Sequence, residues 1–241
     1  MPDQSPRGFA TTRWSLVYSA RDPSAPEARE ALSELCTLYW YPLYAFLRRQ
    51  GYDAPKAEDL TQGFLARLLE KRYLDDVRAD RGRFRSFLLT AVKHFALNER
   101  DREMTIKRGG GTRVVPFELA TAEGLYTAEP RDNVTPETLF ERRWAATVLE
   151  HALSRIRAEY TQAGKAPLFE LLKPYLAGEE DARPYAELAQ DLDMTEGAVR
   201  VAVHRLKRRF GTTLRALIAD TVSNPLDVEE ELRHLAAVVR R

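Results

Sequence analysis

The amino-acid sequence predicts an all-α protein with two small helical domains joined by a flexible linker. Strand signals are nearly absent, because no two alternating β-branched runs are joined by a hairpin turn. Apolar residues instead recur every three or four positions, which is the period of a helix with one buried face. This period lapses over residues 107–134, a segment that opens with Lys107, Arg108 and three glycines. A segment of this composition between two periodic stretches indicates a linker.

The first domain is expected to span residues 25–106, after an N-terminal extension of residues 1–24. Its first helix should cover about residues 26–50, bend at Pro42 and stop at Gly51. Asp53 can cap a second helix. The predicted buried stripe of this second helix is Ala57, Leu60, Phe64 and Leu68. Its polar side chains should lie largely outside that stripe: Glu58, Asp59, Gln62 and Arg67. A third helix should begin near Arg83 and turn four residues inward: Phe87, Leu88, Ala91 and Phe95.

The second domain is expected at residues 135–222, with a separate C-terminal helix in residues 223–241. Thr135 before Pro136 marks a helix start, because the hydroxyl accepts a backbone N–H and proline loses no bond there. Apolar side chains follow in helical register: Leu139, Trp144, Val148, Ala152 and Ile156. Further helices are expected near residues 167–177 and 184–192, from Thr195 onward, and over 226–239.

The composition excludes several classes of function. No HExxH, GxSxG or phosphate-binding glycine motif occurs, and the four histidines fall at no metal-ligand spacing. Cys36 is the only cysteine, so an intramolecular disulfide and a multi-cysteine zinc site are excluded. The sequence therefore predicts a protein that is not an enzyme and uses no metal or other cofactor.

No apolar stretch approaches the roughly 18 residues that a membrane span requires, and the N-terminus lacks a signal-peptide pattern. We therefore expect a cytoplasmic protein without a membrane partner. The formal net charge is only +1, so binding to a polyanion must depend on local basic patches.

Residues 185–209 have the pattern of a helix-turn-helix within the second domain. Ala189 is small enough for the two helices to cross closely, and Val199 fills the angle between them. Asp193 occupies the turn position that usually needs a left-handed residue, a conformation that Asp tolerates. Thr195 can cap the second helix of the pair.

The outward face of that second helix is basic. Five Lys or Arg residues and no acid lie between residues 200 and 209. A solvated face normally mixes both signs, so this run favours contact with nucleic acid over an ordinary wet surface. The predicted contacts to a DNA major groove are Arg200, Val201, His204, Arg205, Lys207 and Arg208.

Two blocks of the first domain resemble the extracytoplasmic-function (ECF) sigma factors of bacterial RNA polymerase. Residues 57–69 match the family's core-binding helix, with an acidic pair, then Leu-Thr-Gln, then an apolar run. The resemblance implies contact with the β′ clamp helices of the polymerase core through Asp59, Gln62 and Arg67. Residues 83–102 resemble the next block, which opens and reads the minus-10 element, and they imply DNA contacts from four side chains: Lys93, Asn98, Arg100 and Arg102.

The resemblance covers about residues 32–102 and 139–217 in the family's order, and it implies a minus-35 contact for the helix-turn-helix. It departs from the family where Lys93 and His94 replace Arg-Asn and where Asn98 replaces Asp, so the preferred minus-10 sequence stays open. The implied partners are polymerase core and promoter DNA, and an anti-sigma factor or other regulator is left open. Two alternatives use the same residues: a helix-turn-helix regulator with a ligand-binding or dimerising first domain, and an adaptor that binds protein alone.

Overall fold

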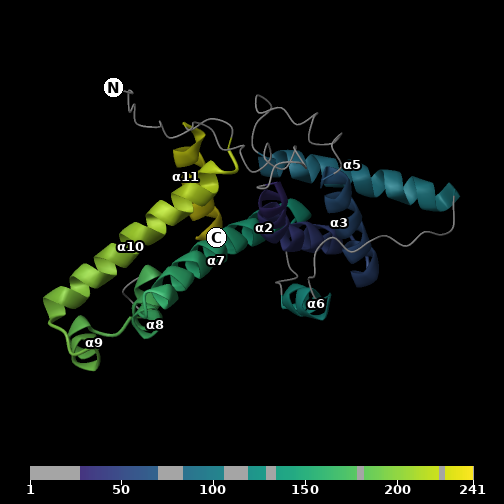
Figure 1. Ribbon diagram of the computed structural model, residues 1–241. Coiled ribbons are helices and arrows are strands. Elements are labelled where there is room, and N and C mark those ends of the chain that lie inside the picture. The colour runs from purple at the N-terminus through teal and green to yellow at the C-terminus, as the bar shows by residue number, and fades with distance from the viewer. Residues whose placement is uncertain are drawn as a thin grey trace, which may run out of the picture. The chain divides into compact units, whose positions relative to one another are not determined.

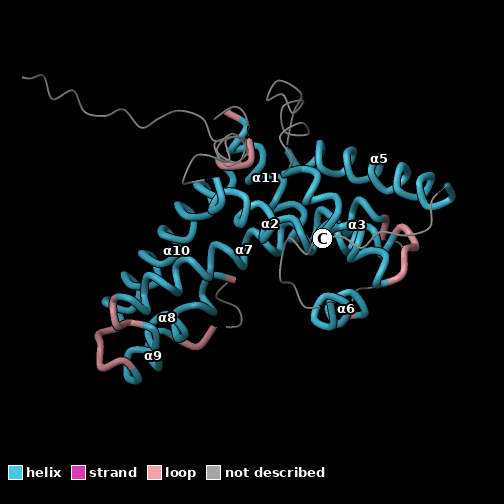
Figure 2. Tube along the Cα trace, turned by 45° about the vertical axis from the view of Figure 1, so that its right-hand side comes forward, coloured by secondary structure: helices cyan, strands magenta, loops and turns pink. Residues whose placement is uncertain are grey.

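The computed structural model describes residues 28–69, 84–105, 119–128, 134–177, 182–222 and 226–240, and these residues form helices without strands (Figures 1 and 2). They belong to two compact units. The first unit contains the described residues up to Thr147 and those from Ile218 onward, and the second contains Val148–Leu217. The boundaries fall inside α7 (Pro136–Gln162) and α10 (Glu196–Ala219), whereas the sequence placed the domain boundary in residues 107–134.

Helix α2 (Ala28–Arg49) forms the centre of the first unit. Every side chain from residue 38 to 47 is buried, so this stretch of the helix is covered on all sides by its neighbours. Pro42 lies inside the helix, and Gly51 follows its end at φ 98°, a backbone conformation that glycine adopts without a Cβ clash. Both the continuation past Pro42 and the stop at Gly51 were predicted and are confirmed.

Helix α3 (Ala54–Leu69) packs against α2, α5 and α6. Asp53 caps it, because its Oδ1 accepts the backbone N–H of Lys56 at 2.9 Å. The predicted stripe is buried: Ala57, Leu60, Phe64 and Leu68. The expectation that the polar side chains lie outside the buried surface is wrong for Glu58 and Gln62, which are 8% and 7% exposed. Three packing neighbours bury more than one stripe of this helix.

Helix α5 (Phe84–Thr105) starts within one residue of its predicted position. It buries Leu88, Ala91 and Phe95 as expected, whereas Phe87 is only partly buried. The Phe95 ring lies 5.8 Å from that of Phe64 on α3. These contacts join α2, α3 and α5 around one core.

Helix α6 (Leu119–Thr127) lies inside the segment for which the sequence indicated no regular structure. It packs against α2 and α3, and polar contacts hold it there. Glu123 accepts hydrogen bonds from Arg48 Nε at 2.9 Å and from Tyr44 Oη at 2.6 Å, and the bond from Arg48 holds the pKa of Glu123 below its usual range. The expectation of an unstructured linker is therefore wrong for residues 119–127. This helix of nine residues is held by polar contacts, and its sequence has no sustained apolar period that could have predicted it. Residues 107–118 lie outside the described residues.

Helix α7 begins as the sequence predicts. The Thr135 hydroxyl accepts the backbone N–H of Thr138 at 3.1 Å, and Pro136 is the first helical residue. All five apolar residues predicted to lie in register are buried: Leu139, Trp144, Val148, Ala152 and Ile156.

The second unit is built from the later part of α7, α8 (Ala166–Leu172), a 3₁₀ turn (Lys173–Leu176), α9 (Tyr185–Asp191) and most of α10. Its core joins all of these elements: Ile156, Phe169, Leu172, Tyr175, Leu188, Ala189, Val199, Val203 and Leu206. Phe210 packs against this core while partly exposed.

The turn between α9 and α10 has the predicted backbone. Asp193 has φ 50°, the left-handed conformation expected for it. The N–H of Met194 donates to the carbonyl of Ala189 at 2.9 Å, which closes the end of α9. The Thr195 hydroxyl accepts the N–H of Ala198 at 3.2 Å and caps α10. The left-handed residue and the cap are therefore confirmed.

This turn supplies a test of local stability. Asp193→Gly is expected to leave the free energy of unfolding unchanged or slightly raised, because glycine adopts positive φ without a steric penalty. Asp193→Val is expected to lower it by about 1–2 kcal/mol, because a β-branched residue resists this conformation. Urea unfolding followed by far-UV circular dichroism measures both variants. Equal stability of the two would contradict the assigned turn.

Candidate nucleic-acid interface

All six residues predicted to contact a duplex are exposed and lie on α10. The helix turns Val199, Val203 and Leu206 into the core, at 2% exposure or less. The residues on its remaining faces include the six exposed candidates: Arg200, Val201, His204, Arg205, Lys207 and Arg208. Val201 is 49% exposed although it is apolar. The surface therefore combines cations that can bind phosphate with one apolar side chain.

Two arginines of α10 are held by acids of the same unit. Arg200 Nη2 lies 2.6 Å from Glu196 Oε1, and its guanidinium lies 4.7 Å from the centre of the Tyr185 ring. Arg209 pairs through Nε with Glu159 Oε2 on α7 at 2.8 Å, and this hydrogen bond lowers the pKa of Glu159. The guanidinium of Arg209 is therefore already paired with a carboxylate of another helix.

The four minus-10 candidates lie on the exposed side of α5, and two of them are paired. Lys93 Nζ forms an ion pair with Glu137 of α7 at 2.7 Å, and the pKa of Glu137 is lowered by this bond. Arg102 pairs with Glu99 one turn earlier at 3.0 Å. Asn98 and Arg100 are exposed. To bind a DNA strand, Lys93 and Arg102 would each have to leave a carboxylate and pair with a phosphate instead.

The three core-binding candidates on α3 are not equally accessible. Asp59 is exposed and Arg67 is partly exposed. Gln62 is buried, and its Nε2 donates to Glu58 Oε1 at 3.4 Å. A contact with another protein through Gln62 therefore needs a rearrangement, so Asp59 is the best placed of the three.

A buried ionic cluster in the first unit was missed by the sequence analysis. Arg85 of α5 is 3% exposed; it pairs with Glu231 of α11 (Asp227–Val239), and its Nε lies 2.9 Å from Glu141 Oε2 on α7. Glu141 also contacts His234 Nε2 at 2.9 Å, and the guanidinium of Arg85 lies 4.7 Å from the centre of the Trp144 ring. Arg85 shares a helical face with Leu88, Val92 and Ala96, and this spacing could have predicted its burial.

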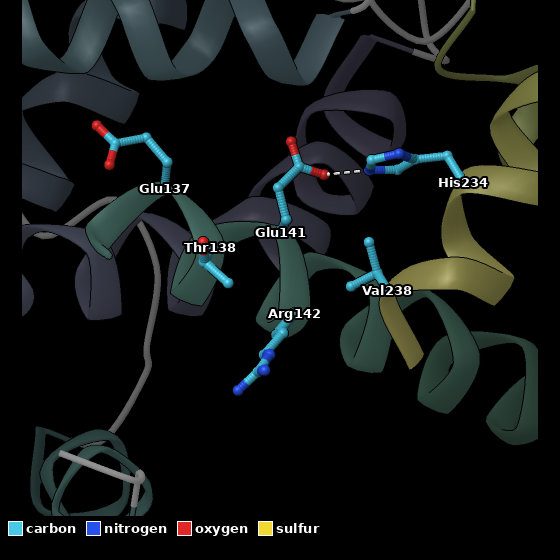
Figure 3. Close-up of a pocket in the computed structure, with 6 residues that line it drawn as sticks. All are labelled: Glu137, Thr138, Glu141, Arg142, His234 and Val238. Atoms are coloured by element: carbon cyan, nitrogen blue, oxygen red, sulfur yellow. Dashed lines mark hydrogen bonds and ion pairs between the residues drawn. The ribbon is translucent and has the colours of Figure 1, made fainter. Parts of the chain in front are cut away.

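A cleft of about 180 Å³ borders this cluster between α7 and α11. In Figure 3, Glu141 points toward His234, whereas the side chain of Arg142 extends away from both. Glu137 also lines the cleft, but it pairs with Lys93. The acids of this cleft are engaged by cations of the same chain, so the cleft has no evident ligand chemistry.

No family model, curated protein or solved structure matches the chain. Within the part of the chain that the structure describes, no helix is long and apolar enough to cross a membrane. The same residues contain no group of three or more His, Cys, Asp or Glu side chains that could hold a metal ion.

Proposed function

We propose that this chain is an RNA polymerase sigma factor of the ECF type, which binds the polymerase core and directs initiation at promoters with minus-35 and minus-10 elements. The observation that carries the proposal is the pairing of α9 and α10 around a left-handed Asp193, with an exposed face of α10 that bears cations. On this proposal the chain performs no bond chemistry itself, and the polymerase makes the RNA.

We assign α9 and α10 as a helix-turn-helix in the second domain. A major groove about 12 Å wide admits one helix, and the N-terminal part of the second helix meets the base edges. Arg200 and Val201 lie in that part of α10, where Arg favours guanine and an apolar side chain favours the thymine methyl group. Arg205, Lys207 and Arg208 follow, where the helix leaves the bases and meets phosphates.

The first domain supplies the other two contacts in this proposal. Asp59 on α3 faces the β′ clamp helices, while Asn98 and Arg100 on α5 bind the separated minus-10 strand with Lys93 and Arg102. This second set of exposed cations is what favours a sigma factor over a helix-turn-helix repressor, because a repressor needs only the contact with duplex DNA.

Binding to polymerase core tests the proposal. The full chain should bind purified bacterial core in a pull-down, and Asp59→Ala should weaken that binding at unchanged helicity. Glu150→Ala, which removes an exposed acid from α7, is the matched control and should bind as the wild type does. Gln62 is left intact because truncating a buried side chain would confuse loss of contact with loss of packing. A wild-type chain that does not bind core would contradict the proposal.

A further inference from the structure

Arg200 is held on two sides before any DNA is present. Its Nη2 and Nε lie 2.6 and 3.1 Å from Glu196 Oε1, one turn earlier on α10. Its guanidinium also lies 4.7 Å from the centre of the Tyr185 ring, at the start of α9. Two helices of the assigned helix-turn-helix therefore contribute to the position of one exposed arginine.

Tyr185, the aromatic contact of Arg200, packs against the core of the second unit. The Tyr185 ring stacks on Tyr175 with 5.1 Å between centroids and 14° between ring planes. Tyr175 is 3% exposed, and its hydroxyl donates to the carbonyl of Arg183 at 2.5 Å. Tyr185 is thus fixed by a buried residue that is itself fixed by a hydrogen bond. The position of the Arg200 guanidinium is therefore linked to the core and does not depend on a surface ion pair alone.

We infer that Tyr185 and Glu196 are positioning residues that set the base preference of Arg200. This inference rests on the proposed function and names how its minus-35 contact becomes selective. Immobilising a long side chain at an interface costs conformational entropy and so weakens binding. A side chain that is already held before binding loses less of this entropy. A guanidinium held in one orientation also favours the base pair whose acceptors match its fork of donors.

Glu196 has a second effect, of opposite sign. Its negative charge at the start of α10 repels phosphates, so it weakens binding to every DNA sequence while it orients Arg200. Glu196→Gln should therefore raise the affinity of the holoenzyme for unrelated duplex DNA and lower its base preference. If the ion pair between Glu196 and Arg200 had no positioning role, Glu196→Gln would leave the base preference unchanged.

The test uses holoenzyme reconstituted with core polymerase and a promoter library randomised across the minus-35 element. Arg200→Ala defines the base pair that Arg200 reads. Tyr185→Leu, which removes the ring, should lower the preference at that pair by about threefold to tenfold. Tyr185→Phe keeps the ring and should stay within about twofold of the wild type. In an Arg200→Ala background, Tyr185→Leu should cause no further loss, because a positioning residue acts only through the residue that it positions.

Thermal unfolding of each variant separates preference from stability. The Glu196→Gln variant keeps the test decisive if Tyr185→Leu does not fold, because Glu196 is exposed. The inference is overturned if Arg200→Ala changes the preference while Tyr185→Leu and Glu196→Gln do not, or if Tyr185→Leu has the same effect with and without Arg200. An Arg200→Ala variant with unchanged preference would overturn the base contact and its positioning together. Absence of any transcription that depends on the wild-type chain would instead overturn the proposed function.

Discussion

Replacing Glu231 with alanine is expected to lower the free energy of unfolding of the first unit by about 3 kcal/mol. Glu231 and Arg85 are 1% and 3% exposed, so the change removes one partner of a buried ion pair and leaves Arg85 in the core. The effect should lie at the lower end of the range for such pairs, because Glu141 still faces the guanidinium.

Tryptophan fluorescence during urea unfolding can measure this loss in the first unit. Trp40 and Trp144 are both buried there, and residues 148–217 contain no tryptophan. Glu230→Ala on the exposed side of α11 is the matched control and should change the stability by no more than about 0.5 kcal/mol. The double variant Arg85→Met, Glu231→Leu should recover much of the loss, because a buried ion pair can be replaced by apolar side chains. A Glu231→Ala protein as stable as the control would contradict the role of the cluster.

Removing the three cations in the later part of the α10 face is expected to weaken binding at all promoters alike. Replacing Arg205, Lys207 and Arg208 with alanine should lower the slope of log affinity against log salt by about three, because each phosphate contact contributes about one. Arg200→Ala should instead relax the sequence preference within the minus-35 element, where a bidentate contact to guanine discriminates by roughly 1–3 kcal/mol. The two kinds of variant should therefore differ in which property they change.

Holoenzyme binding to promoter DNA across a range of salt concentrations measures the salt slope. Arg209→Ala is the matched control, because Glu159 already pairs with this guanidinium and its loss should change the slope little. A change as large for Arg209→Ala as for Arg208→Ala would show that the phosphate-binding face of α10 is oriented differently. Equal loss at every promoter for Arg200→Ala would contradict the base contact.

Local signals in the sequence predicted most of the helix boundaries. Asp53, Thr135 and Thr195 each cap the helix that they were expected to cap, because an N-cap bond depends only on residues two or three positions away. The left-handed Asp193 was predictable for the same reason, since the steric preference belongs to the residue and its turn.

Contacts between residues far apart in the chain were not predictable in this way. Helix α6 depends on a bond between Glu123 and Arg48, 75 positions away, and Arg85 is paired with Glu141, 56 positions away. Gln62 was expected outside the buried surface because a single apolar stripe accounts for only one packing partner of α3. Periodicity predicts which face of a helix is apolar, and it leaves open how many other helices cover its polar faces.

Transcription from a genomic DNA library by core polymerase, with and without this chain, tests the central claim most directly. If the chain is a sigma factor, sequencing of the RNA should show discrete start sites that appear only when the chain is added. DNA upstream of these sites should share two elements at fixed spacing, near minus 35 and minus 10. Specific binding of the chain alone to duplex DNA, together with no start site that depends on it, would contradict the account and favour a repressor.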